Sequence, residues 1–147
     1  MKFVQKTIMI CMSSMVILLS GCKKDEGIGG TSTIKGLVMV NDFDHGFQSP
    51  QPVEVYAARV EKVYVIYGLD HTTYDNDYST SYDGSYEFKY LQKGKYRIFA
   101  YTKDTTGAYN GTINFNASKI ALFEDVEIKS NGSVVTVPTI TILDNNY

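Results

Sequence analysis

Apolar and polar residues alternate with a period of two along much of the chain beyond residue 33. The alternation is clearest between residues 85 and 91, where Tyr86, Phe88 and Tyr90 are separated by Glu87 and Lys89. A period of two predicts β-strands that bury one face, and the apolar spacing of an amphipathic helix does not recur. The sequence therefore predicts an all-β fold in which each strand contributes one face to a shared core.

Turn residues divide this pattern into separate strands. Asp83-Gly84 predicts a β-hairpin, and we expect the strands on either side of residues 92–94 to form an antiparallel hairpin with Tyr86, Phe88, Tyr96 and Ile98 pointing inward. The expected strands cover residues 34–40, 53–58, 63–67, 85–91, 96–101, 122–128 and 134–143, and residues 70–81 form a long connection with room for an edge strand.

The number and character of these strands favour a β-sandwich. Residues 63–67 are apolar on both faces, as expected for a central strand. Pro138 cannot donate a ladder hydrogen bond, which places the last strand at a sheet edge or gives it a bulge. About seven short strands at this spacing are typical of a single sandwich domain.

The N-terminal residues follow a different pattern. Lys2 and Lys6 precede an apolar run over residues 8–19, which is shorter than the roughly 20 residues of a membrane-spanning helix. The run ends in Leu19-Ser20-Gly21-Cys22, which resembles a bacterial lipobox. The cysteine of a lipobox is acylated and becomes the first residue after cleavage. Residues 1–21 are therefore predicted to be a lipoprotein signal peptide, and Cys22 the lipidated residue.

Charged residues and glycines follow Cys22. Lys24, Asp25 and Glu26 resemble the export signal that directs lipoproteins of the Bacteroidota to the outer face of the outer membrane; the alternative is a solvated charge cluster. Residues 22–32 are predicted to be a lipidated anchor and flexible tether, because glycine-rich segments are flexible. Residues 33–147 then form the β-sandwich domain. The predicted localisation is the outer membrane, lipid-anchored and facing the cell exterior.

The amino-acid composition excludes further classes of function. The net charge is −2 with both signs interspersed, so the chain has no basic stripe of the kind that nucleic-acid binding requires. Twelve tyrosines and seven phenylalanines favour strands, and tryptophan is absent from the sequence. Cys11 is lost with the signal peptide, which leaves one cysteine in the mature chain and excludes an internal disulfide.

One part of the sequence resembles a known family. Asp83-Gly84-Ser85-Tyr86-Glu87-Phe88, followed by Leu91 and by Gly94-Lys95-Tyr96-Arg97-Ile98, is similar to the prealbumin-like domains related to the carboxypeptidase regulatory domain. The resemblance implies a single prealbumin-like (transthyretin-like, Greek-key) β-sandwich. Hydrolases and dioxygenases of related fold use paired or closely spaced histidines, whereas His45 and His71 are far apart here. No catalytic residue and no metal-ligand set is therefore assigned, and the chain is not expected to be an enzyme.

Three tyrosines are candidate ligand-binding residues. Tyr74, Tyr78 and Tyr82 lie in a polar segment, and aromatic rings with hydroxyl groups suit recognition of a glycan or a protein. The alternative is that they cover the edge of the sandwich. Asp42 and Asp44 have the spacing of calcium ligands, but the further oxygen ligands of a calcium loop are missing, which favours a polar turn. We expect no cofactor apart from the covalent lipid on Cys22.

Together these features predict an outer-membrane lipoprotein whose single domain is a non-catalytic binding or interaction module. Its partners are the membrane, through the lipid anchor, and a protein or glycan that the sequence does not identify. A structural subunit, fimbria-like or of an envelope assembly, is the alternative, and a small enzyme is the third possibility. An enzyme would need a nucleophile–base pair or a metal cluster, which cannot be assembled from two histidines and no free cysteine.

Overall fold

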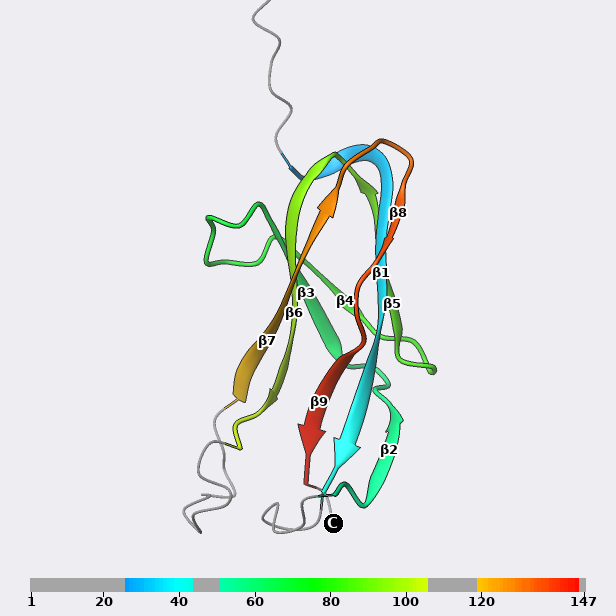
Figure 1. The fold of residues 1–147 in the computed structure, drawn as a ribbon, viewed down its shortest axis with the longest axis vertical. Coiled ribbons are helices and arrows are strands. Elements are labelled where there is room, and N and C mark those ends of the chain that lie inside the picture. The colour runs from blue at the N-terminus through cyan, green and yellow to red at the C-terminus, as the bar shows by residue number, and fades with distance from the viewer. Residues whose placement is uncertain (1–25, 44–50, 106–118, 146–147) are drawn as a thin grey trace, which may run out of the picture.

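A computed structural model describes residues 26–43, 51–105 and 119–145 of the protein. These residues form nine strands and include no helix, which confirms the all-β prediction (Figure 1). Within the same ranges, no helix has the length and apolar character needed to cross a membrane. The strands are β1 (Ile28–Asp42), β2 (Glu54–Ala57), β3 (Lys62–Tyr67), β4 (Asn76–Ser79), β5 (Ser85–Leu91), β6 (Gly94–Lys103), β7 (Lys119–Ile128), β8 (Val134–Thr136) and β9 (Ile140–Asp144).

The strands are arranged in two sheets. In the first sheet, the long strand β1 pairs antiparallel with β2 and β5 and parallel with β8 and β9. The second sheet has the order β4-β3-β6-β7, and all its pairs are antiparallel. The long strands of both sheets run along the longest axis of the molecule (Figure 1). The architecture is therefore sandwich-like, with two facing layers.

The core lies between the two layers and is built from alternate residues of their strands. Ile34 of β1 and Val63 of β3 are completely buried within it. The inward positions that the alternation predicts are confirmed, because Tyr86, Phe88, Tyr96 and Ile98 are all buried. Sequence periodicity thus identified the buried face of the strands correctly.

The predicted hairpin between β5 and β6 is wrong. β5 pairs with β1 in the first sheet, whereas β6 pairs with β3 and β7 in the second. The short connection at Gln92 and Lys93 therefore carries the chain from one layer to the other. Alternation shows which face a strand buries, and both strands bury a face in the same core. It does not distinguish a paired neighbour from a strand on the opposite side of that core.

The hairpin predicted at Asp83-Gly84 is also wrong, because the turn there joins β4 of the second sheet to β5 of the first. Gly84 has a φ of 77°, and its N–H donates to the carbonyl of Ser81 at 3.0 Å. Tyr90 departs from the predicted alternation, because a φ of 60° turns its side chain out and leaves it 69% exposed. Leu91 is buried in its place.

The last predicted strand is divided around its proline. β8 ends at Thr136 and β9 begins at Ile140, so residues 137–139 interrupt the strand at Pro138. Both pieces pair only with β1 among the described residues, which confirms the predicted edge position and irregularity. β4 likewise lies at the edge of the second sheet, within the segment expected to connect two strands. These two differences account for nine strands instead of about seven.

The first strand begins earlier than the sequence predicts. β1 starts at Ile28, so residues 28–32 belong to the folded domain and not to the flexible tether. Glycine suggested flexibility here, but Gly30 allows a close approach between strands. A Cβ atom on Gly30 would lie 1.9 Å from the Leu91 carbonyl oxygen. Ser32 is completely buried, and its hydroxyl donates to the Ser130 carbonyl at 3.2 Å.

Candidate ligand-binding surface

A row of aromatic side chains crosses the outer face of the second sheet. Tyr64 of β3 is opposite Phe99 of β6, which in turn is opposite Phe123 of β7. The Tyr64 and Phe99 ring centroids are 4.9 Å apart with nearly parallel planes, and those of Phe99 and Phe123 are 5.3 Å apart. The strand alternation produces this row, because the neighbours of these residues in each strand point into the core.

Two further tyrosines extend the row. Tyr74, from the connection before β4, lies 4.8 Å from Tyr64 between ring centroids. Tyr101 of β6 lies 5.6 Å from both Tyr64 and Phe99, in edge-on geometry. We call the five residues Tyr64, Tyr74, Phe99, Tyr101 and Phe123 the aromatic platform.

The platform has a buried base and an exposed upper layer. Phe99 is only 5% exposed, because the surrounding rings cover it. Tyr74 and Phe123 are 52% and 54% exposed, and Tyr101 is also exposed. Large apolar rings left open to solvent on a sheet face are typical of interaction sites. The ring-to-ring contacts hold the exposed rings in fixed positions.

An ion pair lies beside the Phe123 end of the platform. Arg97 donates from Nε and Nη2 to the two carboxylate oxygens of Asp125, at 2.7 and 2.8 Å. These hydrogen bonds lower the pKa of the Asp125 carboxyl. The Arg97 guanidinium carbon also lies 5.4 Å from the centroid of the Phe123 ring. The pair thus orders the polar groups beside the exposed ring.

A second ion pair lies at the opposite end of the platform. Lys62 of β3 contacts Asp77 of β4 beside the paired residues Tyr64 and Asp77. The hydrogen bond to Asp77 raises the pKa of Lys62, and burial raises the pKa of the Tyr64 hydroxyl. The four charged groups beside the platform therefore carry no net charge.

The three tyrosines predicted from the sequence to bind a ligand do not lie together. Tyr74 belongs to the platform, whereas Tyr78 packs toward the core, with its ring centroid 6.3 Å from that of Phe88. Tyr82 is exposed near the Gly84 turn, where the Arg59 guanidinium lies 5.5 Å from its ring centroid. Adjacent residues in β4 alternate between faces, which separates Tyr78 from the outer surface.

The other four platform residues are not among the site residues predicted from the sequence. The sequence does contain a signal for Tyr64 and Phe99. In Val63-Tyr64-Val65 and in Ile98-Phe99-Ala100, the aromatic residue lies between two inward-facing aliphatic ones. An aromatic residue in this position points to the opposite face. The register between β3, β6 and β7 was needed to show that these rings meet.

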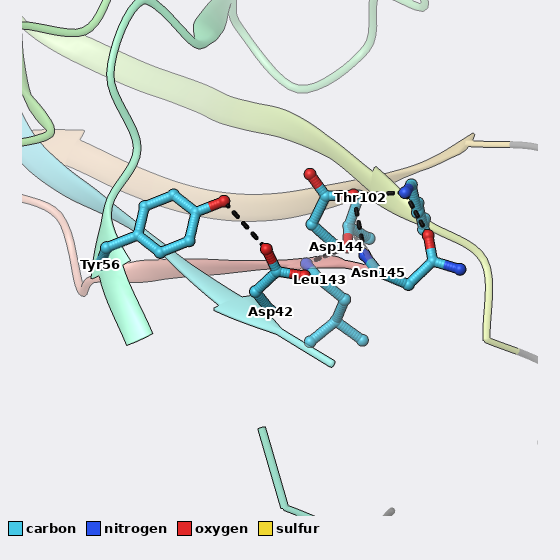
Figure 2. A network of polar contacts seen from close by, with 7 residues as sticks. Asp42, Tyr56, Thr102, Leu143, Asp144 and Asn145 are labelled. Atoms are coloured by element: carbon cyan, nitrogen blue, oxygen red, sulfur yellow. Dashed lines mark hydrogen bonds and ion pairs between the residues drawn. The ribbon is translucent and has the colours of Figure 1, made fainter. Parts of the chain in front are cut away.

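Several other residues singled out in the sequence, Cys22, Lys24, Asp25 and Asp44, lie outside the described residues. Asp42 is buried and accepts a hydrogen bond from the Tyr56 hydroxyl at 3.3 Å (Figure 2). No group of three or more His, Cys, Asp or Glu residues able to hold a metal ion occurs in the part of the chain that the structure describes. The sequence does not favour a calcium site at Asp42 and Asp44, and that interpretation stays a prediction.

Near Asp42, a polar network joins the two sheets. The Leu143 N–H of β9 donates to the Thr102 hydroxyl of β6 at 2.7 Å (Figure 2). The ammonium group of Lys103 contacts Asp144 and Asn145. These contacts connect strands of different layers. We therefore assign the network a structural role.

Comparisons with known proteins find distant structural similarity only. No protein-family model matches the chain, and no curated protein matches it. A crystal structure from Pseudomonas aeruginosa, whose name gives carbohydrate binding as the suspected role, is 12% identical with a TM-score of 0.45, over 76% of this chain and 90% of that one. The structure of (S)-allantoin synthase is 14% identical with a TM-score of 0.36, over 78% of this chain and 42% of that one.

Proposed function

We propose that this protein is a non-catalytic binding module that holds a neutral glycan chain on its aromatic platform. The observation that carries the proposal is the platform itself, in which three exposed rings surround the buried Phe99 and the partly buried Tyr64. Aromatic faces pack against the apolar face of a sugar ring, and tyrosine hydroxyls can bond its edge. The paired charges beside the rings provide donors and acceptors without favouring a ligand of either sign.

The size of the platform favours a glycan over a protein. Stable protein interfaces use roughly 20–30 residues on each side, whereas the platform and its two ion pairs comprise nine. The rings of Tyr64, Phe99 and Phe123 are spaced by one strand separation, similar to the span of one sugar ring. A flat row of this kind suits an extended chain lying across the strands.

The proposal includes the cellular setting predicted from the N-terminal sequence. Cys22 carries the lipid that anchors the domain in the outer membrane, and Lys24, Asp25 and Glu26 direct it to the outer face. We assign the domain to the prealbumin-like group because of the sequence motif that begins at Asp83. What supports these assignments is the lipobox, the charged cluster and the turn motif in the sequence.

Affinity electrophoresis tests the proposed activity. The purified domain is run in native gels that contain a soluble neutral polysaccharide (a mixed-linkage glucan, a xylan or a galactomannan) or acidic polygalacturonate. We expect retardation in at least one neutral gel, and a loss of about tenfold in affinity for Phe123→Ala. Unchanged mobility in every gel would overturn the proposal.

An exposed tyrosine outside the platform provides the matched control. Tyr82→Ala removes a more exposed ring at the Gly84 turn and should leave the retardation unchanged. Equal losses for Phe123→Ala and Tyr82→Ala would show that the platform is not the binding surface. Near-ultraviolet circular dichroism verifies that both variants keep the native fold.

A further inference from the structure

The chain that follows the proposed lipid anchor is hydrogen-bonded to the end of the domain. The Gly27 N–H donates to the Tyr96 hydroxyl at 3.0 Å, and the Gln92 N–H donates to the Gly27 carbonyl at 2.8 Å. The Tyr96 hydroxyl itself donates to the Gln92 carbonyl at 2.8 Å. Gly27 and Tyr96 are both buried, so these bonds are shielded from water.

Contacts of the neighbouring residues reinforce this attachment. The Glu26 carboxylate accepts a hydrogen bond from the Lys95 N–H at 3.4 Å, and its side chain lies directly against Gly94. The Gln92 side-chain amide donates to the Ile28 carbonyl at 2.9 Å. Glu26 and the glycines that suggest a tether are therefore part of the folded domain.

We propose that the domain stands directly on the membrane surface, with the end formed by the connection at Gln92 and Lys93 against the lipid headgroups. This inference rests on the proposed lipidation of Cys22. Only residues 23–25 separate Cys22 from Glu26, and four residue steps span at most about 14 Å. A stem of this length keeps the attached end within reach of the headgroup layer.

The chemistry of this end suits headgroups and not the acyl interior. Lys93, Lys129 and Asn131 are exposed there, in the connections before β6 and after β7. Asp70 and His71 lie beside Glu26 and Lys95 around an open polar hollow of about 520 Å³. A surface of mixed charge can contact a hydrated headgroup layer without burying unpaired charges.

The position of the attached end also orients the glycan surface. β1 starts at the same end as the connection before β6, and the C-terminal end of β9 lies at the opposite end (Figure 1). The long strands run between these two ends. The outer face of the second sheet is therefore presented sideways, along the membrane plane, so that a glycan chain can lie parallel to the membrane.

Quenching of the fluorescence of a single tryptophan tests the proposed position of the domain on the membrane. The chain has no tryptophan, and Cys22 is the only cysteine after Cys11. The protein beginning at Cys22 is coupled through that thiol to a maleimide lipid in phosphatidylcholine vesicles containing headgroup-nitroxide lipid. Lys93→Trp places a reporter at the attached end, and Val53→Trp places one near Asp42 at the other end. We expect several-fold stronger quenching at position 93.

A lengthened stem provides the control. A Gly-Ser linker of about 20 residues between Asp25 and Glu26 should remove most of the quenching at position 93, because such linkers are flexible coils. Equal quenching at positions 93 and 53 in the unextended protein, or strong quenching at position 93 after the extension, would overturn the proposal. Chemical coupling replaces biological acylation, so these outcomes are independent of glycan binding and of lipidation in the cell.

Discussion

The ring of Tyr86 lies across Gly36, the residue opposite it in the register between β5 and β1. A Cβ atom on Gly36 would lie 2.4 Å from the Tyr86 hydroxyl oxygen and 2.6 Å from Cζ. The Tyr86 hydroxyl is buried and has no hydrogen-bond partner among the described residues. Its burial raises the pKa of the phenol well above its ordinary value. The missing side chain of Gly36 thus makes room for a ring that fills the core.

Gly36→Ala tests this contact. The added methyl group would overlap the Tyr86 ring, and overpacking of this kind should lower the free energy of unfolding by about 1–3 kcal/mol. Urea denaturation measures the loss. In a Tyr86→Leu background the same substitution should cost much less, because the ring is gone. An equal cost in both backgrounds would mean that the contact is not responsible.

Tyr86→Phe should leave stability unchanged or raise it by up to about 1 kcal/mol, since the buried hydroxyl that it removes has no described partner. Tyr96→Phe is the matched comparison. It removes a hydroxyl that bonds Gln92 and Gly27, so it should cost about 1–2 kcal/mol. The denaturation midpoints of the two variants measure the two losses. A larger loss for Tyr86→Phe would contradict the finding that the Tyr86 hydroxyl has no described hydrogen-bond partner.

Phe88→Ala should cost about 3–5 kcal/mol, because it leaves a cavity in the core between the two sheets. Lys89→Ala, at the next position in β5, is the control. Its exposed side chain pairs with Glu87, so the change should stay within about 1 kcal/mol. Similar losses at positions 88 and 89 would show that the inward register of β5 is misassigned.

The ion pair of Arg97 and Asp125 predicts a specific acid sensitivity. The pKa of Asp125 is lowered in the folded state, so its contribution is present above the unfolded pKa of about 3.9 and is lost as the pH falls through the folded pKa. Asp125→Asn should therefore reduce the loss of stability between about pH 6 and pH 3. The effect is small because the pair is partly exposed.

Urea midpoints at both pH values measure this difference. If Asp125→Asn lost as much stability as the wild type on acidification, the ion pair would not contribute to the pH dependence.

Cys22→Ala should release the protein from membranes or leave its signal peptide uncleaved, since lipidation requires the thiol. Two or more acyl chains hold a protein firmly, because each buried CH₂ contributes about 0.8 kcal/mol. Membrane fractionation and mass spectrometry of the N-terminal peptide measure the result. An unmodified Cys22 on membrane-associated wild-type protein would contradict the predicted anchor.

Sequence periodicity located most strands and most of the core. Tyr86, Phe88 and Ile98 were all placed inward correctly, because a period of two reports the buried face without reference to other strands. The pairing of β5 required more than this. Its true partner β1 is remote in the sequence, whereas β6 follows after a short connection, so chain proximity favoured the wrong neighbour.

The platform was predictable only in part. Tyr74 was predicted because it is an aromatic residue in a polar segment. Tyr64 and Phe123 lie within strands, where aromatic residues are common, so the sequence alone does not mark them as site residues. Their proximity depends on the register of β3 against β6 and of β6 against β7. A shift of one residue would turn each ring into the core, and no local pattern fixes that register.

The central position of β1 has a mechanical consequence. The strand begins at the end of the domain near Gln92 and bonds with four other strands along its length. Tension between that end and the far end is directed along β1, so its ladder bonds are loaded together and not broken one after another. Resistance to such tension depends on the rate of unfolding more than on the equilibrium free energy. A domain that bears tension in this way can withstand brief pulls even when its thermodynamic stability is modest.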